Sequence, residues 1–522
     1  LEQVRYNDES AEDEWYQIGL TLEGDLGFAT SVVSVSYYER ESSYEADSTA
    51  YVNDLQSFSD AYQAGFNAAY PAYATDMMFY DYGLLANAGP DDYSGAPRTK
   101  YRTASEEDRL SLEARLQFEG EDSNWNAIVG VFYNKKDRSS SDYLEIDDYQ
   151  DTKAAFFQNY YLGFLSPSAN GLPAGSWGDD TNNAWFDVSE TETTDMAIFG
   201  EGNYDVTEDF TVTVGGRWYD NEIDRDYFTG ALVPNDRAPN RNLDYITSDE
   251  NTSVGDDGFV GKLGVRYSID YDKMVYATYS EGFRSGGANL VKANSNIPQS
   301  FESDFLKNYE AGFKTSWMDN RLRVNAALYR MAWEDIQLQI FDSQDGVFSS
   351  GVVNFAEAQI DGVETEIIFA ATEGLEISLT YAYIKAEISE DDTITNDSGE
   401  IIAEVIEGAQ LPITPDQKGS LGLEYNFQNQ WFGMDPYLKF DYSYIGNSVS
   451  SMDEEDAIDT PHYETMDIAV GMANEVWSAN LKLENLEDER AVQFFNQRWG
   501  SEATRASINK PRNLTLTVRR SF

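Results

Sequence analysis

The stretch from Leu322 to Arg330, LRVNAALYR, places an apolar side chain at every second position and mostly polar side chains between them. Side chains of a β-strand point alternately to opposite faces, so this pattern predicts a strand with one apolar and one polar face. The same alternation runs through residues 309–317, and only MDNR (318–321) separates the two segments. Two alternating segments joined by so short a link predict a β-hairpin.

The same unit recurs along the chain, while helical periodicity is scarce. In all, the alternation predicts about 17 strands of roughly 8–11 residues, the length that a tilted strand needs to cross a bilayer. The sequence contains no run of about 18 apolar residues that could span a membrane as a helix. Besides 309–330, hairpins are predicted around residues 16–38, 109–134, 196–218, 259–281, 363–381, 418–444 and 466–483, with a last strand at 512–522.

The connections alternate strictly between turns of about 4–10 residues and long loops. Outer-membrane barrels have this arrangement, with short periplasmic turns and long extracellular loops. A soluble all-β sandwich is the alternative, but it has no reason to place every long loop at one end. We therefore predict an all-β fold, a transmembrane antiparallel β-barrel. The long loops are expected near residues 39–108, 135–195, 219–258, 282–307, 332–360, 385–417, 445–463 and 486–511.

Strand parity bears on how much of a barrel the chain holds. With 17 strands ending on the short-turn side, the first strand, near Trp15, enters from the long-loop side. Bacterial single-chain barrels have an even number of strands. We therefore expect residues 1–522 to form one barrel domain that lacks its N-terminal part.

Composition narrows the possible functions. The chain has 93 acidic and 36 basic residues, a net charge of −57, which would repel nucleic-acid phosphates. It has no Cys and a single His, His462, so thiolate catalysis and multi-His metal cages are excluded. The acidic pairs and runs at 391–392 and 453–456 match no EF-hand spacing and are expected to be solvated. We predict no enzymatic activity, no catalytic or metal-binding residues and no cofactor.

Four stretches carry a family resemblance when taken together in order. They resemble TonB-dependent outer-membrane receptors, specifically the C-terminal part of their barrel. The stretches are VYATYSEGFRSGG (275–287), FESDFLKNYEAGFKTSW (301–317) with the following LRVNAALYRMAWEDIQLQIF (322–341), VNFAEAQIDGVETE (353–366) and the terminal NLTLTVRRSF (513–522).

The resemblance implies a barrel of about 22 strands plugged by an N-terminal domain, of which the plug and about five strands are absent here. It implies TonB-dependent uptake of a scarce extracellular small-molecule ligand, most often a ferric siderophore. Vitamin B12 or a carbohydrate is the second choice, and a passive porin or adhesin barrel is a rival of another class. The implied partners are outer-membrane lipid and lipopolysaccharide, the barrel-assembly machinery, and the TonB complex through the missing plug.

Candidate site residues follow from these expectations. Arg284 lies on the polar side of its strand near the outer mouth, and the long loop at 39–108 is rich in aromatic side chains suited to a bulky ligand. The candidate ligand contacts are Arg284, Tyr62, Phe66 and Tyr80; the expected lipid-facing residues are Leu322, Val324, Ala326 and Leu328; the expected interfacial aromatic residues are Trp125, Trp317 and Trp477; and, by resemblance, the barrel-assembly signal is Leu514, Leu516, Val518 and Phe522, interrupted by Arg520.

Overall fold

The computed structural model describes ten segments of the chain, and almost all of them are β-strand. Within them, no helix is both long and apolar enough to cross a membrane. The described segments are residues 8–48, 99–119, 123–146, 183–231, 248–289, 297–342, 349–395, 401–452, 457–497 and 504–521.

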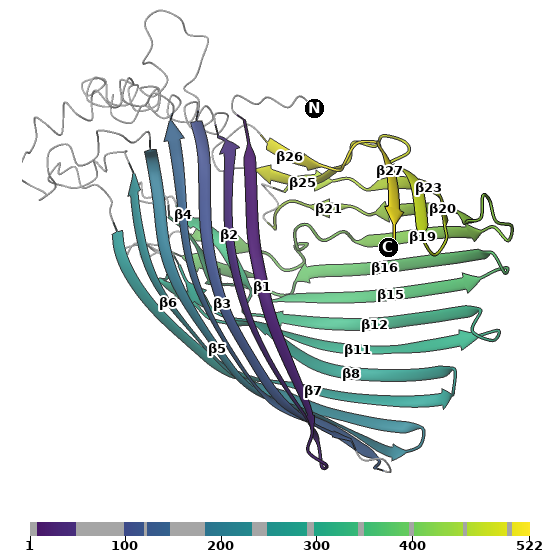
Figure 1. The fold of residues 1–522 in the computed structure, drawn as a ribbon. Coiled ribbons are helices and arrows are strands. Elements are labelled where there is room, and N and C mark those ends of the chain that lie inside the picture. Colours follow the sequence, from purple (N-terminus) through teal and green to yellow (C-terminus); the bar gives the residue numbers. More distant parts are fainter. Residues whose placement is uncertain are drawn as a thin grey trace, which may run out of the picture.

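One antiparallel sheet of 17 strands dominates the molecule, as predicted (Figure 1). Each strand pairs with the next in a continuous meander, from β1 at one edge to β27 at the other. The strands are β1 (Ser10–Asp25), β2 (Thr30–Asp47), β3 (Thr99–Glu119), β4 (Trp125–Ile146), β5 (Asn183–Thr207), β6 (Phe210–Ala231), β7 (Ser248–Asp270), β8 (Lys273–Arg284), β11 (Asp304–Trp317), β12 (Leu322–Glu334), β15 (Ala358–Ala370), β16 (Leu375–Ile388), β19 (Gln417–Asn426), β20 (Asp435–Ile445), β23 (Tyr463–Ala473), β24 (Trp477–Glu484) and β27 (Asn513–Arg520).

The predicted alternation of connections is confirmed. At one end of the sheet, short turns join consecutive strands. In the turn 318–321 between β11 and β12, Met318, Asp319 and Asn320 all take positive φ. Five of the long connections carry small two-stranded ribbons of their own. These are β9 (Gly287–Ala288) with β10 (Ser300–Phe301), β13 (Gln337–Asp342) with β14 (Ser349–Asn354), β17 (Asp392–Thr395) with β18 (Ile401–Val405), β21 (Ser448–Val449) with β22 (Asp459–Thr460), and β25 (Val492–Gln497) with β26 (Thr504–Ile508).

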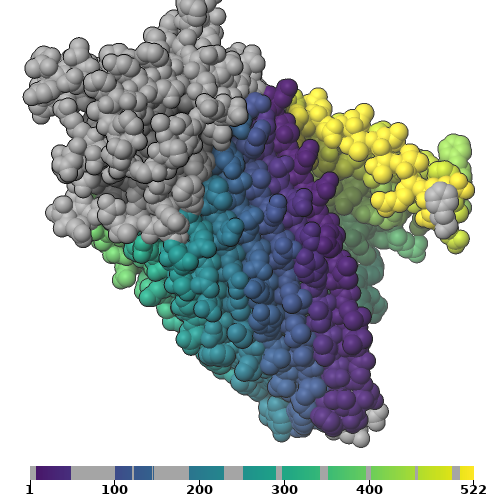
Figure 2. Space-filling model, turned by 60° about the vertical axis from the view of Figure 1, so that its left-hand side comes forward, coloured from purple at the N-terminus to yellow at the C-terminus, as the bar shows by residue number. Residues whose placement is uncertain are grey.

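The predicted strand length is wrong for the N-terminal half of the sheet. Strands β1 to β7 contain between 16 and 25 residues, whereas β19, β20, β23, β24 and β27 contain 8 to 11. Figure 2 shows these long strands side by side as one continuous surface. Their outer parts, such as KKDRSSS at 135–141, are polar on both faces. Backbone pairing continues in these outer parts without any apolar alternation. The hydropathy pattern alone therefore predicts them to be loops.

Below these outer parts, the sheet has one apolar and one polar face across all 17 strands. Strand register places Val324 of β12 opposite Thr315 and Ile367, and Asn325 opposite Lys314 and Glu366. We call the first side the apolar face and the second the polar face. The predicted set Leu322, Val324, Ala326 and Leu328 lies on the apolar face. Exposed side chains there include Ile18, Leu20, Leu22, Val35, Leu112, Val131, Ile198, Val214, Leu263, Leu379, Leu438, Val470, Leu481, Leu514 and Leu516.

On the polar face, tyrosine rings lie over glycines of the neighbouring strand. Tyr329 covers Gly362, its direct cross-strand partner, so closely that a Cβ on Gly362 would lie 2.1 Å from the tyrosine ring. The pairs Tyr219 with Gly258, Tyr276 with Gly312, and Tyr437 with Gly471 repeat this arrangement. The glycines leave room for the rings to lie flat on the sheet.

This contact predicts a position-specific effect of side-chain size. We expect Gly362→Val to destabilise the folded barrel by about 1–3 kcal/mol, because Tyr329 must leave its place. Gly282→Val is the control, since a Cβ on Gly282 meets nothing within 4 Å. Urea unfolding of the two purified variants measures the difference. Equal midpoints would contradict the packing role of Gly362.

Candidate functional site

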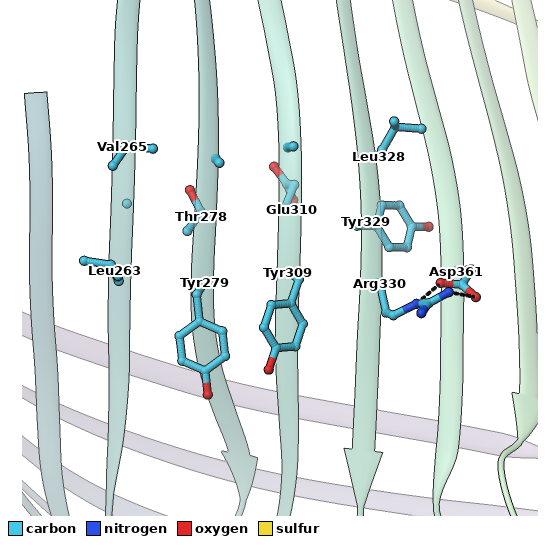
Figure 3. A pocket seen from close by; sticks show the side chains of 13 residues that line it. Leu263, Val265, Thr278, Tyr279, Tyr309, Glu310, Leu328, Tyr329, Arg330 and Asp361 are labelled. Atoms are coloured by element: carbon cyan, nitrogen blue, oxygen red, sulfur yellow. Dashed lines mark hydrogen bonds and ion pairs between the residues drawn. The ribbon is translucent and has the colours of Figure 1, made fainter. Parts of the chain in front are cut away.

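The outer end of the apolar face carries a shallow hollow of about 580 Å³. Figure 3 shows Tyr279 and Tyr309 side by side, with the ion pair of Arg330 and Asp361 on the strands next to them. The two tyrosine rings are 5.0 Å apart, and Tyr309 is 52% exposed. Because the hollow lies on the apolar face, it belongs to the surface predicted to meet lipid and is not a candidate for a transported ligand.

The three predicted interfacial tryptophans all lie at the short-turn end of the sheet. Trp317 ends β11, while Trp125 and Trp477 begin β4 and β24, and all three are exposed. Cations lie over two of the rings: Lys273 Nζ is 4.6 Å from the Trp317 centroid, and the Arg520 guanidinium is 5.3 Å from that of Trp477. From Trp317 to Tyr309 the strand rises roughly 26 Å, or about 20 Å vertically for a tilted strand, close to the height of a lipid-facing band. That Trp125, Trp317 and Trp477 lie at a membrane interface remains a prediction.

The C-terminal strand β27 presents its apolar side chains on the apolar face. Leu514, Leu516 and Val518 are each more than half exposed and lie opposite Leu483, Leu481 and Ala479 of β24. Arg520 shares this face, which explains how it can reach the Trp477 ring. Phe522 lies outside the described residues, and recognition of this strand by the assembly machinery remains a prediction.

Arg284 lies on the polar face, as predicted, but its charge is already matched. Its guanidinium forms an ion pair with Asp304, whose side chain is 2% exposed, and Nε lies 2.9 Å from Oδ2. Trp333 Nε1 donates to the same carboxylate at 3.0 Å, and the Trp333 ring lies under the Arg284 guanidinium. Gln337 donates its side-chain amide to the carbonyls of 284, 285 and 302. The group clamps both ends of the connection between β8 and β11.

Loss of Asp304 should therefore loosen this connection. We expect Asp304→Ala to destabilise it by about 1–3 kcal/mol, because buried donors lose their acceptor, and to speed protease cleavage between residues 285 and 303. Asp361→Asn is the control: it breaks the Arg330 ion pair, which is far more exposed, and should cost less than about 1 kcal/mol. Protease treatment of intact cells, followed by mass spectrometry of the fragments, measures the cleavage of both variants. Unchanged cleavage of the Asp304 variant would count against the clamp.

Beyond the ends of β12, β15 and β16, the ribbons β13–β14 and β17–β18 pack around a small apolar core. It joins β13, β14 and β18 to the polar face of the sheet, and Ile336 and Ile388 are almost fully buried there. Asp391 and Asp392 accept backbone N–H groups of Glu407 and Ala356. These carboxylates therefore brace the ribbons. The core consists of Ile297, Ile336, Ile340, Val353, Phe355, Ala356, Ala358, Ala386, Ile388, Val405, Ala409 and Leu411.

Higher on the polar face of the long strands lies a group of cations that the sequence pattern did not predict. Arg40 on β2, Arg109 on β3, Lys136 and Arg138 on β4, and Arg225 on β6 occupy two adjacent rows of the strand register. We call these five residues the basic band. Strand alternation applied to charge separates Lys136 from Lys135, which lies on the opposite face, but the five cations come together only through the register of the paired strands.

The members of the basic band differ in how far their charge is neutralised. Arg40 forms a bidentate pair with Asp13, and Arg109 pairs with Glu107 at 2.5 Å. These two cations are therefore matched by carboxylates on their own face.

Among the described residues, Lys136, Arg138 and Arg225 have no carboxylate partner within ion-pair distance. Arg225 donates to Thr191 Oγ1 and to the carbonyl of Ala288. Burial, and next the charge of Arg138, lowers the pKa of the Arg225 guanidinium.

The opposite face of the same strands is acidic at this height. Glu39, Asp108, Asp137, Glu192 and Asp224 lie directly opposite one another in a single register row, which we call the acidic row. Like charges placed this way destabilise a sheet unless something neutralises them. Tyr37 donates to Glu39 and Asp108, and Lys135 pairs with Glu192 at 2.9 Å. At this height acids therefore predominate on one face and bases on the other, with Lys135 on the acidic side and Asp13 and Glu107 on the basic side as exceptions.

The remaining predicted positions contribute little to a site. His462 is exposed, and its ring lies 5.8 Å from that of Tyr444. In the described segments, no group of three or more His, Cys, Asp or Glu side chains could hold a metal ion. The candidates Tyr62, Phe66 and Tyr80, and the acidic run 453–456, lie outside the described residues.

Comparisons with known proteins agree with this architecture. The metal-pseudopaline receptor CntO of Pseudomonas aeruginosa (strain UCBPP-PA14) is 25% identical over 263 residues, which is 49% of this chain and 32% of CntO. The ferric yersiniabactin uptake receptor FyuA of Yersinia pestis superimposes with a TM-score of 0.69 at 14% identity, over 99% of this chain and 62% of FyuA. The siderophore receptor PiuA of Acinetobacter baumannii gives 0.66 at 15% identity, over 98% and 65%.

The chain therefore spans about a third of the length of CntO and less than two thirds of either solved receptor. The model of the family described as TonB dependent receptor-like, beta-barrel, matches residues 37–486, most of the chain. This protein chain belongs to the TonB-dependent receptor β-barrel family.

Proposed function

We propose that the protein takes up a ferric siderophore or a related metal chelate by TonB-dependent transport. As a barrel of this family, the chain resides in the outer membrane of a Gram-negative bacterium. The relatives it matches are named as receptors for metal-pseudopaline, ferric yersiniabactin and siderophores. The proposal rests on the match over residues 37–486 together with this agreement among relatives.

The polar face supports a water-filled interior through which such a ligand would pass. It carries hydrogen-bonded polar pairs such as Asn325 with Glu366 at 2.8 Å and Tyr276 with Glu310 at 2.6 Å. The packed outer ribbons would form part of a stable vestibule around the entrance. We further propose contact with the TonB complex through a plug region, with lipopolysaccharide on the apolar face, and with the barrel-assembly machinery. No catalytic residue and no cofactor are proposed.

Growth under iron limitation tests the transport proposal. A strain whose own siderophore receptors are deleted should regain uptake of radiolabelled ferric chelates when it expresses the complete gene, and should lose it again when tonB is deleted. Uptake that persists without TonB would indicate a passive barrel. Rescue by vitamin B12 or a carbohydrate, with no iron uptake, would replace the siderophore by the alternative ligand.

A further inference from the structure

The basic band stands out on the polar face of the long strands, because acids outnumber bases in the chain by 93 to 36. In so acidic a protein a cation readily finds a carboxylate. Among the described residues, Lys136, Arg138 and Arg225 have none within ion-pair distance, and Arg225 is partly buried beside Arg138. Arg138 itself is exposed, but a partly buried cation such as Arg225 beside a second cation is costly unless an anion neutralises the pair.

The band also borders a hollow on the same face. A cavity of about 320 Å³ is lined by Tyr38, Arg40, Glu107 and Arg109, together with Gln17, Ser36 and Ser111. The Arg109 guanidinium lies over the Tyr38 ring at 5.7 Å, and its Nε is buried without a hydrogen-bond partner. An aromatic ring, hydroxyl groups and guanidinium donors together suit a ligand that combines flat rings or carboxylates with negative charge.

The charge of the opposite face shows that the basic band is not a general property of these strands. The acidic row lies on β2 to β6 at the same height, and Lys135, the cation next to it, pairs with Glu192, so the cations without a carboxylate partner among the described residues here lie on the polar face. A strand-wide excess of bases would place them on both faces. This distribution of charge therefore favours a role for the polar-face cations in binding a ligand that enters the barrel interior.

From the basic band we infer that the transported ligand is a small metal chelate with net negative charge, bound on the polar face of β2 to β6 by Lys136, Arg138 and Arg225. This inference deepens the proposed function and rests on it. The band would attract an anion into an interior that the overall charge of −57 would otherwise make unfavourable.

The test compares two ferric probes that differ in charge, an anionic ferric tris-catecholate and a neutral ferric tris-hydroxamate. Equilibrium binding to the purified product of the complete gene is measured for the unmodified protein and for Lys136→Gln/Arg138→Gln. We expect the double variant to bind the tris-catecholate at least about tenfold more weakly, with little change for the neutral probe. Added salt should weaken tris-catecholate binding by the unmodified protein more than by the variant.

Lys136→Gln alone should also weaken tris-catecholate binding, and Lys135→Gln is its matched control, because it removes one positive charge from the adjacent residue but from the opposite face. The charge-preserving Lys136→Arg should retain affinity. Equal losses for both probes, an equal loss in Lys135→Gln, or no loss in the double variant would each overturn the inference while leaving the proposed function intact. If the unmodified protein binds neither probe and imports no ferric chelate, the proposed function fails and this inference fails with it.

Discussion

Val324→Arg should sharply reduce the amount of folded protein in the outer membrane, whereas Asn325→Arg should not. Val324 lies on the apolar face between Thr315 and Ile367. An arginine there would meet hydrocarbon, which costs about 2–4 kcal/mol near the bilayer midplane and less toward its edges. Asn325 lies on the polar face and donates to Glu366, so an arginine in its place would find water and a carboxylate.

The depth of each position refines this expectation. Ala326 lies opposite Phe313, halfway along β11 between Tyr309 and Trp317, so Ala326→Arg should be the most damaging of the three changes. The measurement is the yield of heat-modifiable barrel in outer-membrane fractions of cells that express the complete gene. Equal yields of Val324→Arg and Asn325→Arg would show that the apolar face is not the lipid face. An Ala326→Arg yield above that of Val324→Arg would shift the membrane toward the short turns.

The sequence predicted the parts of the fold in which apolar alternation and turns coincide. The hairpin 309–330 shows both signals, and its register follows from them, since a slip by one residue would exchange the two faces. The outer parts of β3 to β6 escaped prediction because both of their faces are polar. In KKDRSSS of β4, sheet pairing with neighbouring strands maintains the structure, and a single sequence does not display those partners.

The candidate site was predicted less completely, for the same reason. Alternation correctly placed Arg284 on the polar face, but its partner Asp304 is in the next strand and no local pattern connects them. The basic band is distributed over β2, β3, β4 and β6, so its residues are up to 185 positions apart in the chain, from Arg40 to Arg225. Pairing of long strands brings such residues together, and only the register reveals the set.

The 522-residue chain produced alone should aggregate and fail to form a heat-modifiable barrel. In the described part of the chain, β1 pairs only with β2 and β27 only with β24, so both edges of the sheet present unpaired N–H and C=O groups. Figure 1 shows the two edge strands apart from each other. Each unsatisfied backbone group in hydrocarbon costs several kcal/mol, and exposed edges also recruit other strands.

The matched control for this prediction is the product of the complete gene, expressed at the same level and fractionated in the same way. Its barrel should resist denaturation by detergent at room temperature and shift on a gel only after heating. Ile18, Leu20 and Leu22 in the middle of β1 are exposed on the apolar face, so an open edge there would meet lipid and not water. A heat-modifiable monomer of the 522 residues alone would contradict the prediction. It would mean that β1 and β27 pair in the membrane and close a 17-stranded barrel, a strand number that the parity of bacterial single-chain barrels argues against.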